Sequence, residues 1–536
     1  MIKRSALNEI GDYAVWVGML LMASSLPLSL FGLSLGQFII AGGWLVGGNI
    51  KAKFKKAFGD PVVWVLWGVY FWVVIGLWNT TNIHFALDSL RIKAPLLLMP
   101  LFFSSIQQFT LRQFRILLAF LVSATLVSTI ISFIIYLGFT NVKVHDIRDI
   151  VIFLSHIRLA LLVCFSVISC LWFIHHFTNY LHKFIGYLIV IWFVYFLVLL
   201  ESLTGIFILS ATAVLYIVYQ IFKRKTLIVV RALGIIFVVF MFSSAYKMIQ
   251  YVFIDSIKVI TVDPSKLLKK TKRDSDYVSF TSRQDAENGN LVWINICESE
   301  MDSVWHQRTG KSIYAFDVSG HEIQYPLMRF LASKNLNKDA EGVSRLSETE
   351  IHAIEKGIAN VNDLTGNMIS KRIRDLAWEY RIYHFTQNPS EHSFTMRLEF
   401  WKTGWYIFKQ HLFAGVGTGD IQDEYNKAYI NLGSKLNKEW RLASHNEYLR
   451  IAILYGIPGL IFFVVSLFYP LIKRKKSNDI LYLAFLFIAL CSMLTEDTLE
   501  TQTGVTFFAF LNALLLFQGK VVLKIPQEEN LEVVIE

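Results

Sequence analysis

The sequence predicts an all-α polytopic membrane protein with about twelve transmembrane helices and one large, mainly helical segment outside the membrane. Of its 536 residues, 54% are hydrophobic and only 17% are charged, whereas soluble domains carry about 25% charged residues. The apolar residues occur in runs of about 17–25, the length that spans a bilayer. The basic residues lie in short blocks between these runs. Membrane topology therefore accounts for much of the net charge of +10, and no nucleic-acid partner is expected.

The apolar runs divide the chain into two membrane domains. Residues 1–244 contain about nine predicted spans, residues 448–519 contain three, and residues 520–536 follow as a tail. The start of the chain has a basic flank but no small-residue cleavage site, so no cleavable signal peptide is expected. The predicted spans lie near residues 13–30, 33–49, 61–78, 88–106, 115–137, 152–174, 183–200, 204–222, 226–244, 448–472, 480–496 and 503–519.

Three basic blocks set the predicted orientation of these spans. The blocks are Lys51/Lys53/Lys55/Lys56, Lys223/Arg224/Lys225 and Lys473/Arg474/Lys475/Lys476. With twelve spans and a cytoplasmic N-terminus, all three blocks fall on the cytoplasmic side, as the positive-inside rule requires. Both termini are therefore predicted to be cytoplasmic, and residues 245–447 are predicted to lie on the opposite side of the membrane.

Residues 245–447 have the composition of a globular segment with helices. Ser347 and Glu350 form a capping-box pattern before an apolar face that contains Ile351, Ile354, Ile358 and Val361. Near residues 395–412, a second helical pattern carries its apolar side chains on one face and lysines off that face. This pattern favours a helix lying at the membrane–water boundary, with an ordinary core helix as the alternative. Its apolar residues are Leu398, Trp401, Trp405, Phe408 and Leu412.

His445 is the first candidate catalytic residue. It lies in the stretch "SHNEYLRIAILYG", where Ser444 and Glu447 have the spacing of a capping box just before an apolar run. If Ser444 is the N-cap, His445 is the first helical residue, and the helix dipole favours its neutral imidazole. A neutral imidazole at the outer membrane surface can act as a general base. The alternative is a polar residue at a membrane boundary without a catalytic role.

Two further features lie upstream of His445. Arg397 begins the predicted boundary helix, and its planar guanidinium suits phosphate oxygens, although arginines also flank apolar helices simply to reach water. The stretch "GVGTGD" contains Gly415, Gly417 and Gly419, but no strand precedes it, so it is not a dinucleotide fingerprint. We interpret it as a flexible turn whose backbone N–H groups could contact a phosphate.

Other ionisable residues lie near predicted span ends. Arg158 and Lys93 are candidate anion ligands, because charges in such places are costly and often functional. On the outer side, the carboxylates could orient these basic groups or bind an acceptor, or could simply be solvated loop ends. These carboxylates are Glu201, Glu496, Asp497 and Glu500. No residue spacing with the strength of a zinc motif is present, so no metal or other cofactor is expected.

Taken together, these motifs resemble the O-antigen ligase and polymerase superfamily. The resemblance rests on about twelve spans with one large outer segment, on R-L-x-x-W from Arg397, on "GVGTGD", and on H-N-x-Y-L from His445 followed by "YGIPGL". It is concentrated between about Arg397 and Leu460, and the segment before Arg397 has no match in it. The resemblance implies a multi-span fold like that of C-type glycosyltransferases. It also implies a donor glycan carried on undecaprenyl diphosphate at the periplasmic face of the bacterial inner membrane.

The resemblance also assigns roles at matching positions. His445 matches the family histidine near the start of a late span, Arg397 matches a diphosphate-engaging arginine, and Arg158 matches a second membrane-edge arginine. Asn446, Glu447 and Glu201 are then expected to orient groups or to face the acceptor. The implied reaction is an inverting transfer of the glycan to an acceptor hydroxyl, without a metal. Ligation to lipid A-core is the first expectation. Glycan polymerisation, O-glycosylation of a protein, and, in another class, a lipid-linked glycan flippase stay open.

Overall fold

The computed structural model describes residues 6–519 except 145, 223–227, 264, 266, 319, 366 and 367. In these residues the chain is almost entirely helical, and its sheet is one two-stranded hairpin, β1 (Ala286–Glu287) with β2 (Asn290–Leu291). The helices of the N-terminal part are α1 (Ala6–Ser25), α2 (Leu30–Val46), α3 (Ile50–Phe58), α4 (Pro61–Ile75), α5 (Ile83–Lys93), α6 (Pro95–Ser105), α7 (Leu111–Tyr136), α8 (His156–His176), α9 (Tyr180–Leu199), α10 (Leu203–Phe222) and α11 (Ile228–Gln250).

Further helices follow in the middle and at the end of the chain. The middle part contains α12 (Glu298–Thr309), α13 (Gln324–Ser333), α14 (Ala340–Ser344), α15 (Glu348–Glu355), α16 (Met368–Thr386), α17 (Ser393–Gln410) and α18 (Ile421–Asn431). The last part contains α19 (Glu447–Lys473), α20 (Ile480–Thr495) and α21 (Gln502–Ala513), which a π-helical turn, η8 (Leu514–Gln518), extends.

Every predicted span coincides with a helix or a helix pair. The span predicted near 88–106 is instead two short helices, α5 and α6, because the chain turns at Ala94 and Pro95 opens the second helix. Among the described residues, five helices are long and apolar enough to cross a membrane, or six if the bent pair α2–α3 is one span. The remaining apolar helices are shorter, so the count of twelve spans stays a prediction.

Helices α1 and α2 pack closely because glycines lie at the positions where the two helices face each other. In α1 and α2, a Cβ atom added at Gly11, Gly18, Gly36 or Gly43 would lie 3.0 Å or less from atoms of the facing helix. Small residues at facing positions let two helix backbones approach closely, as in membrane helix pairs. The chain turns between these helices at residues 26–29, and Ser29 caps α2 by accepting a hydrogen bond from Gly32 N–H.

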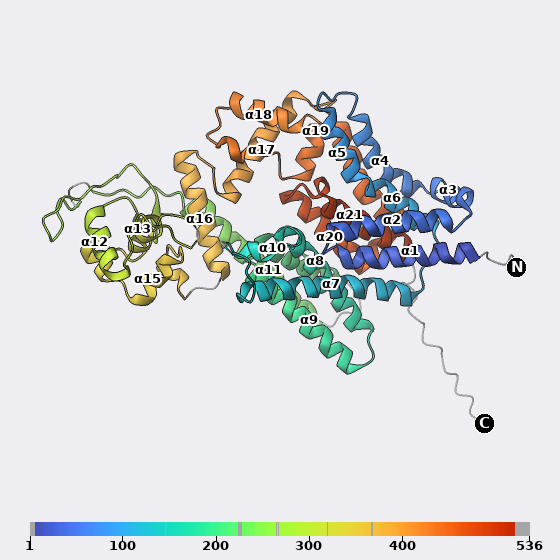
Figure 1. The fold of residues 1–536 in the computed structure, drawn as a ribbon, viewed down its shortest axis with the longest axis horizontal. Helices are drawn as coiled ribbons and strands as arrows, with labels where there is room; N and C mark the ends of the chain where they lie inside the picture. Colours follow the sequence, from blue (N-terminus) through green and yellow to red (C-terminus); the bar gives the residue numbers. More distant parts are fainter. Residues whose placement is uncertain are drawn as a thin grey trace.

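The molecule is elongated, and α1, α2 and α3 lie toward one end of it (Figure 1). At the opposite end lies the unit that contains α12, α13 and α15 (Figure 1). Arg474, from the third basic block, pairs with Asp60, which caps α4 directly after the first basic block. Two of the three predicted cytoplasmic blocks therefore share one end of the bundle. The block Lys223/Arg224/Lys225 lies outside the described residues.

The unit around α12–α15 has a hydrophobic core of its own, separate from the core of the helical bundle. The core includes Trp305, Leu327 and Phe330, all fully buried. The predicted capping box at Ser347 and Glu350 is confirmed. The helix α15 that it starts ends at Glu355, ahead of Gly357 with φ 81°, so Ile358 and Val361 pack on this core from outside the helix. We call residues 256–366 the insert unit.

The insert unit enters and leaves the bundle at one place. Arg381 on α16 donates hydrogen bonds to the carbonyl oxygens of Ser256, Lys258 (3.0 Å) and Gln284. Beside it, the rings of Phe253 and Tyr380 contact each other with centroids 4.8 Å apart. These contacts hold the segment that leaves α11 against the helix that returns to the bundle.

The last long helix, α19, is broken within its span. Gly456 has φ 67° and ψ −166°, and Pro458 follows it. A side chain at Gly456 would lie 2.5–2.6 Å from the carbonyl oxygens of Leu412 and Phe413. The carbonyls freed by the break are satisfied by another segment, because Val416 N–H donates to Ile453 O at 2.9 Å and Gly417 N–H to Leu454 O at 3.1 Å. An interrupted membrane helix is tolerated where neighbouring groups pair its backbone in this way.

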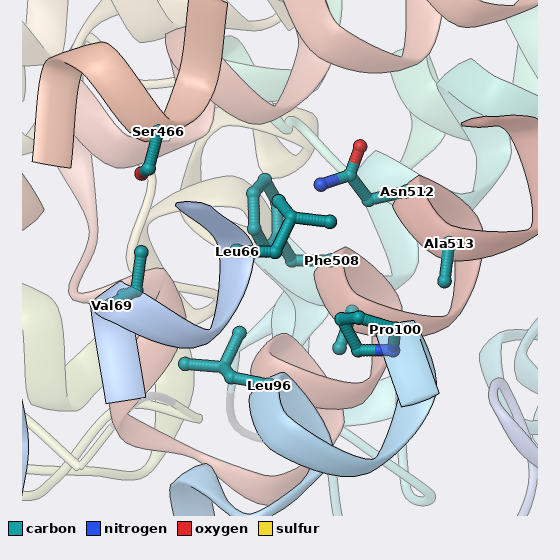
Figure 2. A pocket seen from close by; sticks show the side chains of 9 residues that line it. Leu66, Val69, Leu96, Pro100, Ser466, Phe508, Asn512 and Ala513 are labelled. Carbon is teal, nitrogen blue, oxygen red and sulfur yellow. The ribbon is translucent and has the colours of Figure 1, made fainter. Parts of the chain in front are cut away.

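One small cavity lies within the bundle. Figure 2 shows a cavity between α4, α6, α19 and α21, lined by apolar residues together with Ser466 and Asn512. Its volume is about 10 Å³, which is room for about one water molecule. This cavity is therefore too small to hold a substrate.

Candidate active site

His445 lies just outside α19, and the predicted N-cap is wrong. The N-cap is Asn446, whose side chain accepts a hydrogen bond from Leu449 N–H at 2.9 Å, and the helix begins at Glu447. His445 precedes the cap and has φ 44°, in the left-handed region. The argument that placed His445 on the first turn of the helix dipole therefore does not apply. The side chain is 31% exposed, so a substrate can reach it.

Glu496 connects His445 to Arg397. Its Oε1 lies 2.5 Å from Arg397 Nη2, and its Oε2 lies 3.6 Å from His445 Nδ1, longer than a hydrogen bond. The imidazole also stacks on Phe400, one turn after Arg397 on α17, with ring centroids 5.5 Å apart and planes inclined by 23°. His445 and Arg397, which the sequence predicted as a base and as a phosphate ligand, are therefore neighbours in space.

The carboxyl of Glu496 is held in its ionised form. Burial alone would raise the pKa of Glu496, but the adjacent His445 and the charge of Arg397 outweigh this and lower the pKa below its ordinary value. Glu496 follows α20 directly, in a loop of residues 496–501 that we call the acidic loop. An ionised carboxylate beside Nδ1 favours the tautomer with the proton on that nitrogen, which leaves Nε2 free to accept a proton.

The turn that contains His445 is fixed by the next residue of the acidic loop. Asp497 Oδ1 accepts hydrogen bonds from Asn446 N–H at 2.8 Å and from Ser444 Oγ at 3.2 Å. Asn446 also donates from Nδ2 to Leu494 O at 2.9 Å. The residues on both sides of His445 are therefore bonded to the end of α20 and to the loop that follows it.

Arg158 lies in the first turn of α8, whose N-cap is Ser155. Its Nη1 donates to Ser155 Oγ at 2.9 Å, and it interacts electrostatically with Glu496 and Asp497. No carboxylate of the described residues lies within ion-pair distance of it. Since a helix N-terminus and an unpaired guanidinium both attract anions, this turn is suited to a phosphate group.

Lys93 does not reach this surface. Its side chain is 3% exposed, and its Nζ lies 2.5 Å from Glu500 Oε1 and 3.0 Å from Ser89 Oγ. Because the protein itself occupies the ammonium group, Lys93 is an internal ion-pair partner and not a diphosphate ligand.

The glycine-rich stretch does not form a phosphate cradle. Every N–H group from Gly415 to Gly419 donates inside the protein, to His411, Ile453, Leu454 and Gly76 carbonyls and to Thr80 Oγ1. Gly415 and Gly417 have φ 69° and 89°, and side chains at Gly417 and Gly419 would meet backbone atoms of Asn79 and Asn82. The stretch is therefore a tight packing element that supports the break in α19, and not a flexible turn.

The remaining predicted residues have structural contacts. Glu447 is fully buried, and its Oε2 accepts a hydrogen bond from Leu499 N–H at 2.8 Å, so it does not face an acceptor. Asn446 serves as the helix cap. Glu201 lies at the end of α9, where it pairs with Lys371 of α16 at 3.7 Å, and the structure gives it no contact with His445 or Arg397. In the described part of the chain, no group of three or more His, Cys, Asp or Glu side chains could hold a metal ion.

Several residues of this site were not predicted from the sequence. Glu496, Asp497 and Glu500 were named without a definite role, and Arg450, Phe400 and His156 were not considered. His156 opens α8 and interacts electrostatically with Glu496 and Arg397. The available signal was the concentration of three carboxylates within five residues between two apolar runs, where unpaired charges are costly.

Residues 357–464 match the family described as O-antigen ligase. The chain carries an O-antigen ligase domain. This domain extends from the end of the insert unit through α16, α17 and α18 to the part of α19 that follows its break. Arg397 and His445 belong to the O-antigen ligase domain, whereas Glu496 and Arg158 come from outside the matched residues. No curated protein matches the chain.

Proposed function

We propose that this protein transfers a glycan from undecaprenyl diphosphate to an acceptor hydroxyl at the outer face of the bacterial inner membrane. One observation carries the proposal: His445 and Arg397 of the O-antigen ligase domain lie on either side of the Glu496 carboxylate. A base, a carboxylate that orients it and a cation for the leaving group are the parts that this reaction needs. His445 is the general base in the proposal.

The donor is bound by the two arginines in this proposal. Arg397 uses Nη2 for Glu496, and its side chain is 24% exposed, so the accessible part of its guanidinium can donate to a phosphate oxygen without leaving Glu496. Arg158 and the first turn of α8 supply donors for a second phosphate. A polyprenyl diphosphate leaves readily once its developing charge is stabilised, so the acceptor hydroxyl is the group that needs activation.

The reaction then proceeds in one displacement. His445 Nε2 takes the proton of the acceptor hydroxyl as its oxygen attacks the anomeric carbon. The bond from that carbon to the diphosphate oxygen breaks, and the diphosphate departs against the arginines. Attack from the opposite face inverts the anomeric centre. Glu496 stabilises the imidazolium that forms, so its contribution is largest when the proton has been transferred.

Ligation to lipid A-core is our first choice of acceptor. In that case residues 245–447 are periplasmic and both termini are cytoplasmic, with α17 at the outer membrane boundary. The exposure of Trp405, 52%, between Lys402 and Lys409 supports a boundary position for α17. The insert unit, which has a groove lined by Phe316, Asp317 and Glu355 among others, supports a second candidate in which it binds a protein acceptor.

The test is a transfer assay with the purified full-length protein. Undecaprenyl-diphosphate glycan is supplied with lipid A-core, with a candidate acceptor protein, or with no second acceptor, and products are separated by gel shift. We expect transfer to lipid A-core and its loss in His445→Ala, with donor binding retained. Longer lipid-linked chains without a second acceptor would indicate a polymerase instead. Donor binding without any transfer would favour a flippase, and an active His445→Ala variant would remove the base role.

A further inference from the structure

Arg450 is a buried arginine that contacts two carboxylates of the acidic loop. It lies five residues after His445 on α19, and its side chain is 6% exposed. Its Nη1 is 3.3 Å from Asp497 Oδ2, and its Nη2 is 3.0 Å from Glu500 Oε2. The guanidinium therefore connects the two ends of the short turn that follows α20. The single ammonium group of a lysine would be less suited to binding both carboxylates, because it lacks the planar fork of donors.

The contacts continue into the bundle on one side. The other oxygen of Glu500, Oε1, pairs with Lys93 of α5 at 2.5 Å. Lys93, Arg450, Asp497 and Glu500 carry two positive and two negative charges, so the four groups balance. Removing one member of such a buried set leaves an uncompensated charge. The free-energy cost of that buried charge exceeds the net stabilisation that the intact set provides.

The contacts continue to His445 on the other side. Asp497 uses Oδ2 for Arg450 and Oδ1 for the Asn446 N–H and Ser444 hydroxyl, the groups that flank His445. His445 is a non-glycine residue with φ 44°, and such a conformation persists only where the surroundings hold it. Asp497 contributes to that hold together with Leu494 O and Phe400, so a change in the orientation of Asp497 shifts the turn that carries the imidazole.

We propose that Arg450 is a positioning residue for the transfer reaction: through Asp497 it holds the turn that aims His445 at Glu496. This proposal rests on the proposed function for its effect on rate. Arg450 is buried and belongs to a closed ion-pair set, so it does not contact donor or acceptor. Its loss therefore lowers kcat and leaves the KM values of both substrates unchanged.

The experiment compares three variants of the full-length protein. Arg450→Met removes the guanidinium and leaves one excess negative charge. Arg450→Met with Glu500→Gln restores the charge balance but not the partner of Asp497. Arg474→Met is the matched control, because Arg474 forms its ion pair with Asp60 at the opposite end of the same helix. Each variant is assayed for thermal stability in detergent, for kcat and KM, and for the rate at which diethyl pyrocarbonate modifies His445, followed by mass spectrometry.

We expect Arg450→Met to lower kcat by about 10- to 100-fold, the usual effect of displacing a catalytic group through its supporting contacts. Modification of His445 should be faster, since the turn is no longer fixed. In the double variant, stability should recover while kcat stays low and modification stays fast. Arg474→Met should match the wild type in kcat and in modification.

Two results would overturn the proposal. The first is a double variant whose kcat recovers together with its stability, since Arg450 would then act through charge balance alone. The second is an unchanged rate of His445 modification in Arg450→Met. Because modification is measured without substrates, a wild type that transfers no glycan would refute the proposed function while the modification rates still test the positioning of His445.

Discussion

Replacing Glu496 by glutamine removes a charge and keeps the shape of the side chain. In the proposed reaction His445 is neutral before proton transfer and cationic afterwards. The carboxylate 3.6 Å from Nδ1 therefore attracts the imidazole mainly in the transition state. An interaction made only in the transition state appears in kcat and not in KM. Glu496→Gln should accordingly lower kcat while the KM of the acceptor stays unchanged.

The size of the effect follows from the distance. Two unit charges 3.6 Å apart attract by about 1 kcal/mol in bulk water and by about 5 kcal/mol at an effective dielectric constant of about 20. The imidazole is 31% exposed and the carboxylate 12%, so the site lies between these limits, toward the screened one. A value of about 2 kcal/mol corresponds to a reduction in kcat of about 30-fold.

The assay is steady-state transfer from undecaprenyl-diphosphate glycan at saturating donor and acceptor, with Asp479→Asn as the matched control. Asp479 is a buried, ion-paired carboxylate, 2.7 Å from Lys476, and it lies at the opposite end of α20 from Glu496. The control variant should keep the wild-type kcat even if its stability falls. Equal losses of kcat in the two variants, or an unchanged kcat in Glu496→Gln, would refute the assignment of Glu496 to the transition state.

Three further predictions concern donor binding, the break in α19 and pH. Arg158→Lys keeps the charge but loses the guanidinium fork, so the KM of the donor should rise about tenfold with little change in kcat; an unchanged KM would remove Arg158 from the donor site. Gly456→Ala places a side chain on left-handed backbone and against two carbonyl oxygens, so thermal denaturation should show a loss of about 2 kcal/mol or more. The control Gly42→Ala, with open space around it, should cost nothing; similar melting temperatures would contradict the packing argument. Because the pKa of Glu496 is lower in the folded protein than in the unfolded chain, its contribution to stability is complete above about pH 4.5 and is lost as the pH falls through the folded value. The stability of the wild type should therefore exceed that of Glu496→Gln at pH 7 and approach it in acid, and a constant difference would argue against an ionised Glu496.

The helices were predictable wherever a long apolar run or a capping pattern was present. The capping box at Ser347 and Glu350 was predicted correctly, because its signal is contained in four neighbouring residues. The position of the helix start after His445 was predicted incorrectly. Ser444 and Asn446 are both good caps, and the choice between them depends on Asp497, which binds Ser444 and the N–H of Asn446 from 51 or more positions away.

The candidate site was also predictable only in part, because it depends on contacts between residues that are far apart in the sequence. The types and local spacing of His445 and Arg397 indicated their chemistry. Their meeting depends on Glu496, which is 99 positions from Arg397, and a single sequence does not show which carboxylate a basic residue will find. Lys93 illustrates the same limit, since the sequence made it a candidate anion ligand near a span end, whereas in the structure Glu500 and Ser89 enclose it.

The hydrogen bonds that Arg381 donates where the insert unit joins the bundle bear on which parts of the sequence can change. Hydrogen bonds and a ring contact join the segment that leaves α11 to helix α16. The two ends of the insert unit are therefore held next to each other where the unit meets the bundle. The unit also buries its own apolar residues, and the O-antigen ligase domain begins only near its end. Insertions, deletions or a wholly different module between these two points would therefore leave the geometry around His445 intact. Evolution, or a protein engineer, can therefore exchange the insert unit without rebuilding the candidate site around His445.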